Sequence, residues 1–345
     1  MGSRVTFPMA GTVAVVDETD AALTDGQVRV RTLFSGISAG TELTSYRGTS
    51  PHLTKRWDRD RRLFSAGSAD PSFPVTDLGY EEVGEVAEIA GGADAVSLGD
   101  RVWGTWGHRS SAVIDASHAA KRVLPAGADP RIGIFSHIGA VALNAVIDAD
   151  IHVGEVVAVF GLGVPGQLVA QVARLNGGRV VVVDGIAARR ELALRLGAEA
   201  ALDPAEPVAE RIRELTDGRG ADVAIEISGN ARALHEAIRS VAYNSRVVAS
   251  GFLQGDAIGL RLGEEFHHNR IQLISSQISG SAAAVSHRWD RYRLNSTAIR
   301  LAAEGRLDVL SLITRTVSLD EVADAYRALD QNPHDQLQVV IDFRS

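Results

Sequence analysis

The chain has 345 residues, with 45% hydrophobic and 23% charged side chains and a formal net charge of −8. This composition is that of a globular protein and excludes a disordered chain, a coiled coil and a collagen-like repeat. Since domains cluster near ~100–150 residues, we expect two of them. An acidic chain without a basic block suits a phosphate backbone poorly, so we expect no nucleic-acid partner. The absence of cysteine excludes disulfides, a thiol nucleophile and cysteine-based metal sites.

No pattern in the sequence predicts a membrane or secreted protein. We find no apolar run that approaches the ~20 residues of a membrane-spanning helix. The first residues, Met1 to Gly11, lack the basic-then-apolar layout of a signal peptide. We therefore expect no membrane partner and a cytoplasmic location.

The first third of the chain is predicted to be rich in β-strands. Turn signals such as Asp25-Gly26 and Gly99-Asp100 separate short valine-rich runs. The expected strands are residues 12–16, 27–33, 84–89, 101–104 and 111–114. Short strands with close turns predict a small barrel or sandwich. Residues 48–77 interrupt the pattern with prolines and the charged run from Lys55 to Arg62, so we expect a functional or disordered loop there.

From Gly154 the pattern changes to alternating strands and helices. Residues 156–160 are continuously apolar, as in a strand covered on both faces, and apolar residues then recur at helical spacing. Further strands are expected at 179–183, 221–227, 246–250 and 271–275, with helices at 189–196 and 234–241. This alternation predicts an α/β fold with a doubly wound parallel sheet. Helices at 292–303 and 319–329 and a strand at 337–343 complete the chain.

A glycine-rich turn lies between the first of these strands and its helix. Gly161-Leu162-Gly163-Val164-Pro165-Gly166 matches G-x-G-x-x-G, whose glycines permit a tight turn, close approach of a pyrophosphate and packing of the helix on the sheet. The helix N-terminus then faces the phosphates. The strand before the turn and the helix after it predict a dinucleotide site.

Asp184 ends the next strand, eighteen residues after Gly166. An acidic residue there accepts hydrogen bonds from the adenosine ribose, which favours NAD over NADP. Arg189 and Arg190 follow closely, and they either reach a 2′-phosphate or are solvated at the start of a helix. We expect NAD as the cofactor.

The order of these parts resembles the medium-chain dehydrogenase/reductase superfamily. The resemblance rests on the β-rich first part, the segment Gly79-Tyr80-Glu81-Glu82-Val83-Gly84, the Gly99-Asp100-Arg101-Val102 turn and the glycine turn. It implies a discontinuous GroES-like catalytic domain, residues 1–138 and 279–345, and a Rossmann domain, residues 139–278. It also implies cofactor contacts from Gly161, Gly163, Val164, Gly166, Asp184, Arg189, Ser228, Gly229 and Ser276.

The chain departs from the zinc-dependent members of that superfamily at the ligand positions. Ser38 or Ala39 falls where those members have cysteine, Tyr80 replaces the histidine of G-H-E, and His137 falls at the remaining ligand position. The four-cysteine structural zinc lobe is absent. These residues lack the nitrogen and sulfur ligands that zinc prefers, so we expect no metal.

Among branches poor in zinc, the chain is most similar to sugar-oxidising bacterial members of the guloside 3-dehydrogenase type. The shared features are Gly40-Thr41-Glu42, Tyr46-Arg47-Gly48, the long insertion, His267-x-Asn269 and Arg288-Trp289-x-Arg291. The implied substrate is a sugar, glycoside or cyclitol with a secondary hydroxyl.

Without a metal, a side chain must take the hydroxyl proton. Family position places Thr41, Glu42, Tyr80, Glu81 and His137 around the former metal site. His137 is either the general base, since histidine titrates near neutral pH, or a structural histidine. Tyr80 either orients the hydroxyl or packs as an aromatic. Lys55, a further catalytic candidate, is otherwise a solvated loop charge.

The remaining expectations concern substrate and partners. Candidate substrate-binding residues are Glu81, His267, Asn269, Arg288 and Trp289. The expected partners are a small polar substrate and further copies of the chain, as a homodimer or larger homo-oligomer. Two alternatives stay open: a zinc-free quinone or enoyl reductase, and a non-catalytic NAD-binding regulator.

Overall fold

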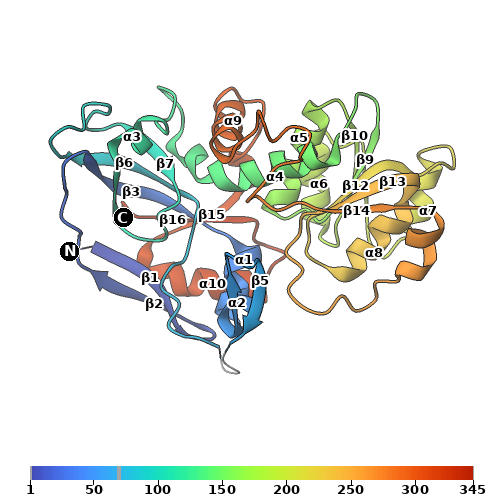
Figure 1. The fold of residues 1–345 in the computed structure, drawn as a ribbon, viewed down its shortest axis with the longest axis horizontal. Coiled ribbons are helices and arrows are strands. Elements are labelled where there is room, and N and C mark those ends of the chain that lie inside the picture. Colours follow the sequence, from blue (N-terminus) through green and yellow to red (C-terminus); the bar gives the residue numbers. More distant parts are fainter. Residues whose placement is uncertain (1, 68–70, 345) are drawn as a thin grey trace. The chain divides into compact units, whose positions relative to one another are not determined.

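The computed structural model describes residues 2–67 and 71–344. The chain divides into two compact units (Figure 1). Unit 1 contains the residues up to His137 and those from Val309 onward, and unit 2 contains Ile138–Asp308. Each unit is described by itself below.

Unit 1 is built on a mixed sheet in which β3 (Gln27–Ile37) is central. The strand order is β15-β16-β3-β6-β7, and β8 also pairs with β3. β15 and β16 are parallel, whereas the other pairs are antiparallel. The bounds are β6 (Glu82–Ile89), β7 (Arg101–Gly104), β8 (Ser111–Asp115), α3 (Ala116–Ala120), a 3₁₀ helix (Pro130–Phe135), β15 (Ile313–Val317) and β16 (Gln338–Asp342).

A separate antiparallel hairpin is formed by β1 (Gly2–Met9) and β2 (Thr12–Glu18). The sequence predicted its second strand but not its first. Its side chains pack with α1 (Ala39–Tyr46) and α10 (Val322–Gln331) in one apolar core. Three rings meet there, with centroids 5.0 Å apart for Phe7 and Tyr326 and 5.6 Å apart for Phe7 and Tyr46. This core joins the first and last parts of the chain.

The insertion expected as a loop at 48–77 has structure of its own. It contains α2 (Pro51–Thr54) and an antiparallel hairpin of β4 (Lys55–Asp58) and β5 (Leu63–Ala66). Trp57 and Phe64 pair across the hairpin, with ring centroids 4.9 Å apart. Residues 68–70, which the expected loop included, lie outside the described residues.

Unit 2 contains a parallel sheet in the order β11-β10-β9-β12-β13-β14, which confirms the expected doubly wound fold. The order reverses at β9 and β12, and such a switch point is where these folds bind ligands. Its strands are β9 (Val156–Phe160), β10 (Arg179–Val183), β11 (Ala200–Leu202), β12 (Ala221–Glu226), β13 (Val241–Ala249) and β14 (Gln272–Ser275). Its helices are α4 (Ser136–Ala149), α5 (Val164–Leu175), α6 (Ala187–Arg195), α7 (Val208–Glu214), α8 (Ala231–Ser240) and α9 (Arg291–Ala303).

Side chains alternate between the two faces of each strand in this sheet. On one face, Ala158 and Phe160 pack with Ile212 of α7 and with Leu234 and Ile238 of α8. The helix expected through residue 241 ends at Ser240, because Val241 already pairs with Ala221 in the sheet. The end of β12 and the start of α8 therefore lie beside the end of β9.

The boundary between the units differs from the one expected at residue 279. A Cβ atom on Gly139 would lie 2.7 Å from Cβ of Ala298, so α4 and α9 approach closely. Gln171 of α5 also exchanges two hydrogen bonds with the backbone of Asp308. Residues 279–308 therefore belong to unit 2, and the chain returns to unit 1 at Val309.

One apolar helical stretch, Pro130–Ala149, is long enough by composition alone to cross a membrane. Its most apolar window has a mean hydropathy of 1.6 but is 83% buried inside the protein. The sequence analysis found no apolar run of this length. Burial to this degree is that of a core helix.

Candidate active site

The glycine turn has the geometry that dinucleotide binding requires. Gly161 has a φ of 95°, and a Cβ atom there would lie 2.6 Å from Cβ of Ser228. A Cβ atom on Gly166 would collide with the carbonyl oxygen of Gly161. Both positions therefore require glycine. Gly163 caps α5, and Val164 begins it, so the first amides of the helix face the turn as in an anion-binding site.

Asp184 is fixed directly after β10 by backbone amides. The amide of Leu162 in the glycine turn donates to Oδ2 at 2.6 Å, and the amide of Ile186 donates to Oδ1 at 2.7 Å. Each carboxylate oxygen keeps lone pairs for further donors. Asp184 thus lies next to the glycine turn with capacity to accept from a ribose.

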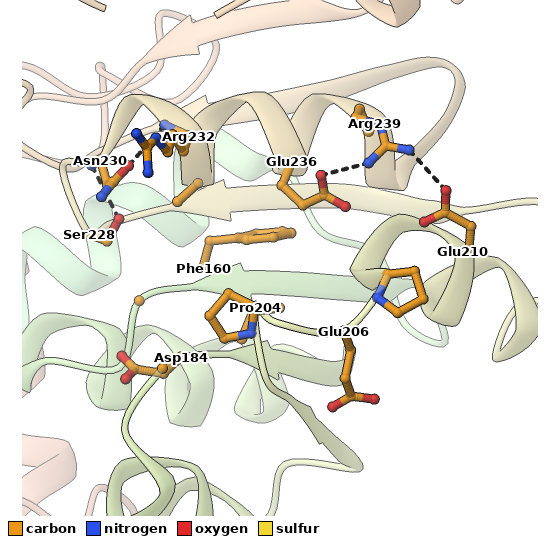
Figure 2. Close-up of a pocket in the computed structure, with 15 residues that line it drawn as sticks. Phe160, Asp184, Pro204, Glu206, Glu210, Ser228, Asn230, Arg232, Glu236 and Arg239 are labelled. Atoms are coloured by element: carbon orange, nitrogen blue, oxygen red, sulfur yellow. Dashed lines mark hydrogen bonds and ion pairs between the residues drawn. The ribbon is translucent and has the colours of Figure 1, made fainter. Parts of the chain in front are cut away.

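A pocket of about 670 Å³ lies at the ends of β9, β10 and β12 (Figure 2). Asp184, Ser228 and Asn230 lie at one end of it, and Glu206, Glu210, Glu236 and Arg239 lie at the other, with Phe160 between them. The full lining is Phe160, Gly161, Val183, Asp184, Gly185, Pro204, Glu206, Pro207, Glu210, Ser228, Asn230, Arg232, Ala233, Glu236 and Arg239. Gly161 and Asp184 place the predicted cofactor residues in this pocket.

Carboxylates outnumber cations on the pocket wall. Arg239 is held by three of them, Glu236 at 2.8 Å, Glu210 at 2.9 Å and Glu265 at 3.3 Å. These contacts raise the pKa of the Arg239 guanidinium. An arginine paired in this way has little capacity left for a phosphate.

The two arginines after Asp184 do not line this pocket. Arg190 donates to the carbonyl of Asp184 at 2.6 Å and pairs with Asp203 at 3.0 Å. Burial lowers the pKa of the Arg189 guanidinium, an effect that Asp184 opposes. The prediction that Arg189 contacts the cofactor stays untested.

Three further predicted cofactor residues follow the sheet strands. Ser228 and Gly229 form the turn after β12, and Ser228 lines the pocket. Ser276 is buried after β14 and accepts from the Asn144 amide at 3.3 Å. Ser228 therefore lies at the nucleotide pocket, whereas Ser276 is not part of its lining.

Unit 1 gathers a cluster of hydroxyls and one imidazole. The Tyr80 hydroxyl donates to Oγ1 of Thr41 at 3.2 Å and forms a short hydrogen bond with Oγ of Ser38. The Tyr80 and His137 rings meet edge to face, with centroids 4.7 Å apart. Burial, with the nearby Glu81, raises the pKa of the Tyr80 phenol. Three of the predicted catalytic residues, Thr41, Tyr80 and His137, thus lie together, with Tyr80 as a hydrogen-bond donor.

Glu42 is buried behind this cluster. Its Oε1 accepts from the amide of Ser38 at 2.8 Å, and its Oε2 accepts from Nε2 of His108 at 2.9 Å and from the Tyr326 hydroxyl. Glu42 holds the backbone of Ser38, and Ser38 in turn holds Tyr80. Because the link to Ser38 is a backbone amide, it does not relay a proton. Glu42 was predicted to be catalytic, but its geometry is that of a positioning residue.

His108 joins Glu42 to a second buried carboxylate. Its Nδ1 lies 2.6 Å from Oγ of Ser35, and the Ser35 hydroxyl donates to Oε1 of Glu82 at 2.9 Å. When both carboxylates are ionised, the Ser35 hydroxyl donates to Glu82, so Nδ1 of His108 donates to Ser35 and Nε2 donates to Glu42, which is the hydrogen-bond pattern of an imidazolium. Burial lowers the pKa of His108, but Glu42 and Glu82 outweigh that effect and raise it.

Glu81 is the third buried carboxyl group of unit 1, with 1% of its surface exposed. Its Oε2 has no hydrogen-bond partner among the described residues. Burial, followed by the charges of Glu42 and Glu82, raises the pKa of Glu81 well above its usual value. This shift in pKa favours the protonated form of Glu81, which precedes β6 and follows Tyr80 in the chain.

The residues at the former ligand positions do not fit zinc. Ser38 and Tyr80 offer hydroxyl groups that bond to each other, burial raises the pKa of Glu81, and His137 alone of this set offers an imidazole. Zinc prefers thiolate, imidazole and ionised carboxylate ligands. Within residues 2–67 and 71–344, the group of side chains close enough to hold a metal ion is His235, Glu264 and Glu265 in unit 2.

Among the described residues, none of the remaining candidates lines the nucleotide pocket of unit 2. Lys55 is exposed at the start of β4. His267 stacks edge to face on His268, at 5.5 Å between centroids. The Arg293 guanidinium covers one face of Trp289 at 4.4 Å and donates to the carbonyl of Arg288 at 2.6 Å. Asn269 accepts through its carbonyl from the Asn244 amide.

Sequence reasoning missed four polar residues of unit 1: Ser35, Glu82, His108 and Tyr326. Glu82 stands inside the quoted Tyr80-Glu81-Glu82 segment, so a second acidic residue there was a visible signal. Glu42 and Tyr326 are 284 residues apart, and no local pattern joins them.

Comparison with known proteins gives the family. A family model described as zinc-binding dehydrogenase matches residues 164–294. The chain is 31% identical over 338 residues to D-guloside 3-dehydrogenase of Escherichia coli K12, covering 96% of this chain and 97% of that protein.

Two solved structures share the fold over 99% of both chains. One is a putative zinc-binding dehydrogenase from Sinorhizobium meliloti 1021 bound to NADP, with a TM-score of 0.78 and 23% identity. The other is a short chain alcohol dehydrogenase from Escherichia coli CFT073 in complex with NADH, with a TM-score of 0.77 and 19% identity. The chain belongs to the zinc-binding dehydrogenase family of the medium-chain dehydrogenase/reductase superfamily.

Proposed function

We propose that this protein is an NAD-dependent dehydrogenase that interconverts a secondary alcohol and a ketone on a sugar, glycoside or cyclitol without catalytic zinc. The observation that carries the proposal is the Ser38–Tyr80–Thr41 hydrogen-bond chain with His137 beside it. The resemblance puts Ser38 or Ala39, Tyr80 and His137 at the positions where zinc-dependent members of the superfamily hold their metal. The D-guloside 3-dehydrogenase relative supports a sugar-like substrate.

Asp184 and the carboxylates of the pocket support NAD rather than NADP. Asp184 keeps lone pairs for ribose hydroxyls, and its charge repels a 2′-phosphate. Arg190 and Arg239 are engaged with carboxylates. NAD, when bound, supplies the hydride acceptor.

The proton chemistry falls to unit 1. Oxidation of the alcohol transfers its carbon-bound hydrogen as hydride and its hydroxyl proton to a base. His137 is the proposed base, because imidazole titrates near neutral pH and Tyr80 stays protonated. The Tyr80 phenol donates a hydrogen bond to the oxygen as negative charge develops on it.

The same proposal covers location and assembly. We place the protein in the cytoplasm, acting on a small polar molecule without membrane or nucleic-acid partners. We also propose a homodimer or larger homo-oligomer, which light scattering on the purified protein measures directly.

The decisive experiment is turnover of a panel of sugars, glycosides and cyclitols with NAD, before and after treatment with a chelator. We expect NAD-dependent turnover that survives chelation, with no stoichiometric zinc by elemental analysis. About one zinc per chain, lost together with activity, would contradict the metal-free proposal. Oxidation of NADPH with enones would instead indicate a reductase, and NAD binding without any turnover would indicate a regulator.

His137→Ala and Tyr80→Phe test the assigned roles. Loss of a general base lowers kcat by about 10²–10⁴-fold, whereas NAD affinity and Tm stay nearly constant. Tyr243→Phe, at an exposed tyrosine of unit 2, is the control for Tyr80→Phe. Normal turnover by His137→Ala would place the base elsewhere.

A further inference from the structure

Glu226 is a fully buried carboxylate at the end of β12, next to the nucleotide pocket. One oxygen, Oε1, accepts from the amide of Ser228 at 2.7 Å, from the amide of Gly229 at 3.0 Å and from the Ser228 hydroxyl. A single oxygen thus fixes the whole turn that follows the strand. Hydrogen bonds to an ionised acceptor are about twice as strong as those to a neutral one.

The other oxygen of Glu226, Oε2, has no hydrogen-bond partner among the described residues. It lies against Gly251, where a Cβ atom would come within 2.8 Å of it and would collide with the amide nitrogen of Gly229. Close packing on this side keeps the carboxyl group pressed towards the turn. The pairing partners of Glu226 in the sheet, Phe160 and Ala249, are uncharged.

The turn that Glu226 holds forms one wall of the pocket (Figure 2). Ser228 and Asn230 line the pocket opposite Asp184. Ser228 packs against Gly161 of the glycine turn, and its Oγ accepts from the Asn230 amide at 3.2 Å. The Asn230 side chain caps α8 by accepting from the Arg232 amide at 2.9 Å. Displacement of the turn would therefore move the pocket wall, the packing on Gly161 and the start of α8 together.

We propose that Glu226 is a positioning residue for the dinucleotide: its ionised carboxylate holds the Ser228–Gly229 turn in the conformation that binds the cofactor. The assignment rests on the proposed function, because it takes the pocket as the NAD site. Glu226 contacts the turn and not the pocket itself, since it is absent from the pocket lining. Burial raises the pKa of Glu226 and the donors of the turn oppose that effect, so protonation of Glu226 as the pH falls weakens its hold on the turn.

Two other charged side chains lie near the turn, those of Arg232 and Asp184. Arg232 in the first turn of α8 is exposed, and Asp184 lies across the pocket with its two oxygens on backbone amides. Burial raises the pKa of Glu226, and the hydrogen bonds from Ser228, Gly229 and Asn230 lower it.

The test compares Glu226→Gln with Asp222→Asn by calorimetry. Asp222 starts the same strand, and its Oδ2 accepts from the Val156 amide at 2.8 Å, far along β12 from the pocket. Asp222 also pairs with Arg219, so Asp222→Asn removes a carboxylate of the same strand, together with its ion pair, without touching the turn. Dissociation constants for NAD⁺, NADH and ADP-ribose are measured from pH 5 to pH 8, together with Tm.

We expect Glu226→Gln to bind all three ligands about tenfold more weakly at pH 8, because charge-assisted hydrogen bonds become neutral ones. The loss is the same for all three because they share the adenosine diphosphate. Affinity of the unmutated protein falls as the pH drops, whereas that of Glu226→Gln changes much less. Asp222→Asn binds like the unmutated protein at every pH.

Three results would overturn the assignment. They are unchanged affinity in Glu226→Gln, a loss confined to NAD⁺, which would mean a direct effect on the charged nicotinamide ring, and an equal loss in Asp222→Asn. If Glu226→Gln is unstable, Glu226→Asp replaces it, since the shorter side chain keeps the charge but retracts from the turn. A failure of the unmutated protein to bind any dinucleotide contradicts the proposed function itself, and the assignment with it.

Discussion

The two units bury carboxyl groups in different ways. In unit 1, Glu42 and Glu82 accept from side chains in distant parts of the chain, His108, Tyr326 and Ser35, as well as from the amides of Ser38, Glu81 and Trp106. In unit 2, Asp184 and Glu226 accept mainly from backbone amides of neighbouring turns. The first arrangement ties separate elements of a core together, whereas the second fixes the shape of loops that line a pocket.

The two ways of burying a carboxyl group predict different effects of mutation. A carboxylate that accepts from amides of a loop sets the geometry of that loop, so its loss should affect binding first. When one member of a buried cluster of charged side chains is removed, the carboxylate that it paired with is left as an unpaired charge. An unpaired buried charge lowers the free energy of unfolding. We therefore expect mutations in the network of Glu42, His108 and Glu82 to lower stability, and mutations of Asp184 or Glu226 to change cofactor binding.

The largest expected effect is that of His108→Ala on stability. The variant leaves Glu42 and Glu82 buried without the cation between them. Breaking a buried pair costs about 3–5 kcal/mol, so the free energy of unfolding in a urea titration should fall by that amount. His118→Ala is the control, at an exposed histidine of the same unit, and should change little. A loss below about 1 kcal/mol would mean that His108 is neutral and unpaired.

The charge on His108 also gives a pH dependence. Since the pKa of folded His108 is raised above its usual 6.5, its contribution to stability is complete below pH 6.5 and is lost as the pH rises through the raised value. Unfolding free energies measured from pH 6 to pH 9 should therefore decline, and His108→Gln should decline less steeply. A parallel decline in both proteins would contradict the charged state.

In unit 2, Asp184→Ala should change cofactor preference. The variant removes the repulsion of a 2′-phosphate and the acceptors for the ribose hydroxyls. We expect the ratio of NADP to NAD dissociation constants to fall by about tenfold, equivalent to ~1.4 kcal/mol. Asp203→Ala is the control, because that carboxylate pairs with Arg190 and does not line the pocket. Equal affinity of the unmutated protein for NAD and NADP would contradict the role of Asp184.

The same contrast explains what the sequence could predict. The glycine turn and Asp184 lie within one strand, one helix and the next strand, so a short stretch of sequence is enough to predict the nucleotide site. The hydroxyl cluster was reached through resemblance, which implies that Ser38 or Ala39, Tyr80 and His137 fall at the ligand positions of zinc-dependent members. The network behind it could not be predicted, because Ser35 and His108 are 73 residues apart and Glu42 and Tyr326 are 284 apart. Only the folded sheet and the packing of α10 bring them together.

Tyr326→Phe tests a single member of that network. It removes the hydroxyl that donates to Glu42 and leaves the ring in place. Loss of one buried hydrogen bond to a charged group costs about 1.5–3 kcal/mol, and His108 still serves the same oxygen, so we expect the lower end of that range by thermal unfolding. Tyr46→Phe is matched to it, since Tyr46 packs in the same aromatic group at 6.0 Å. Equal losses in both variants would show that the Glu42 contact contributes nothing.

The smallest expected effect belongs to Glu81→Gln, and its sign depends on pH. Burial raises the pKa of folded Glu81 well above the 4.5 of the unfolded chain. Between those values the unfolded chain binds fewer protons, so the stability of the unmutated protein falls as the pH rises. Glutamine cannot ionise, so the variant should match the unmutated protein within about 0.5 kcal/mol near pH 5 and become the more stable of the two at pH 8. Glu88→Gln, at an exposed position of β6, the strand that follows Glu81, should show no such divergence. If the gap does not widen with pH, the pKa of Glu81 is not raised in the folded protein, and the distinction between Glu81 and the hydrogen-bonded carboxyl groups of Glu42 and Glu82 is wrong.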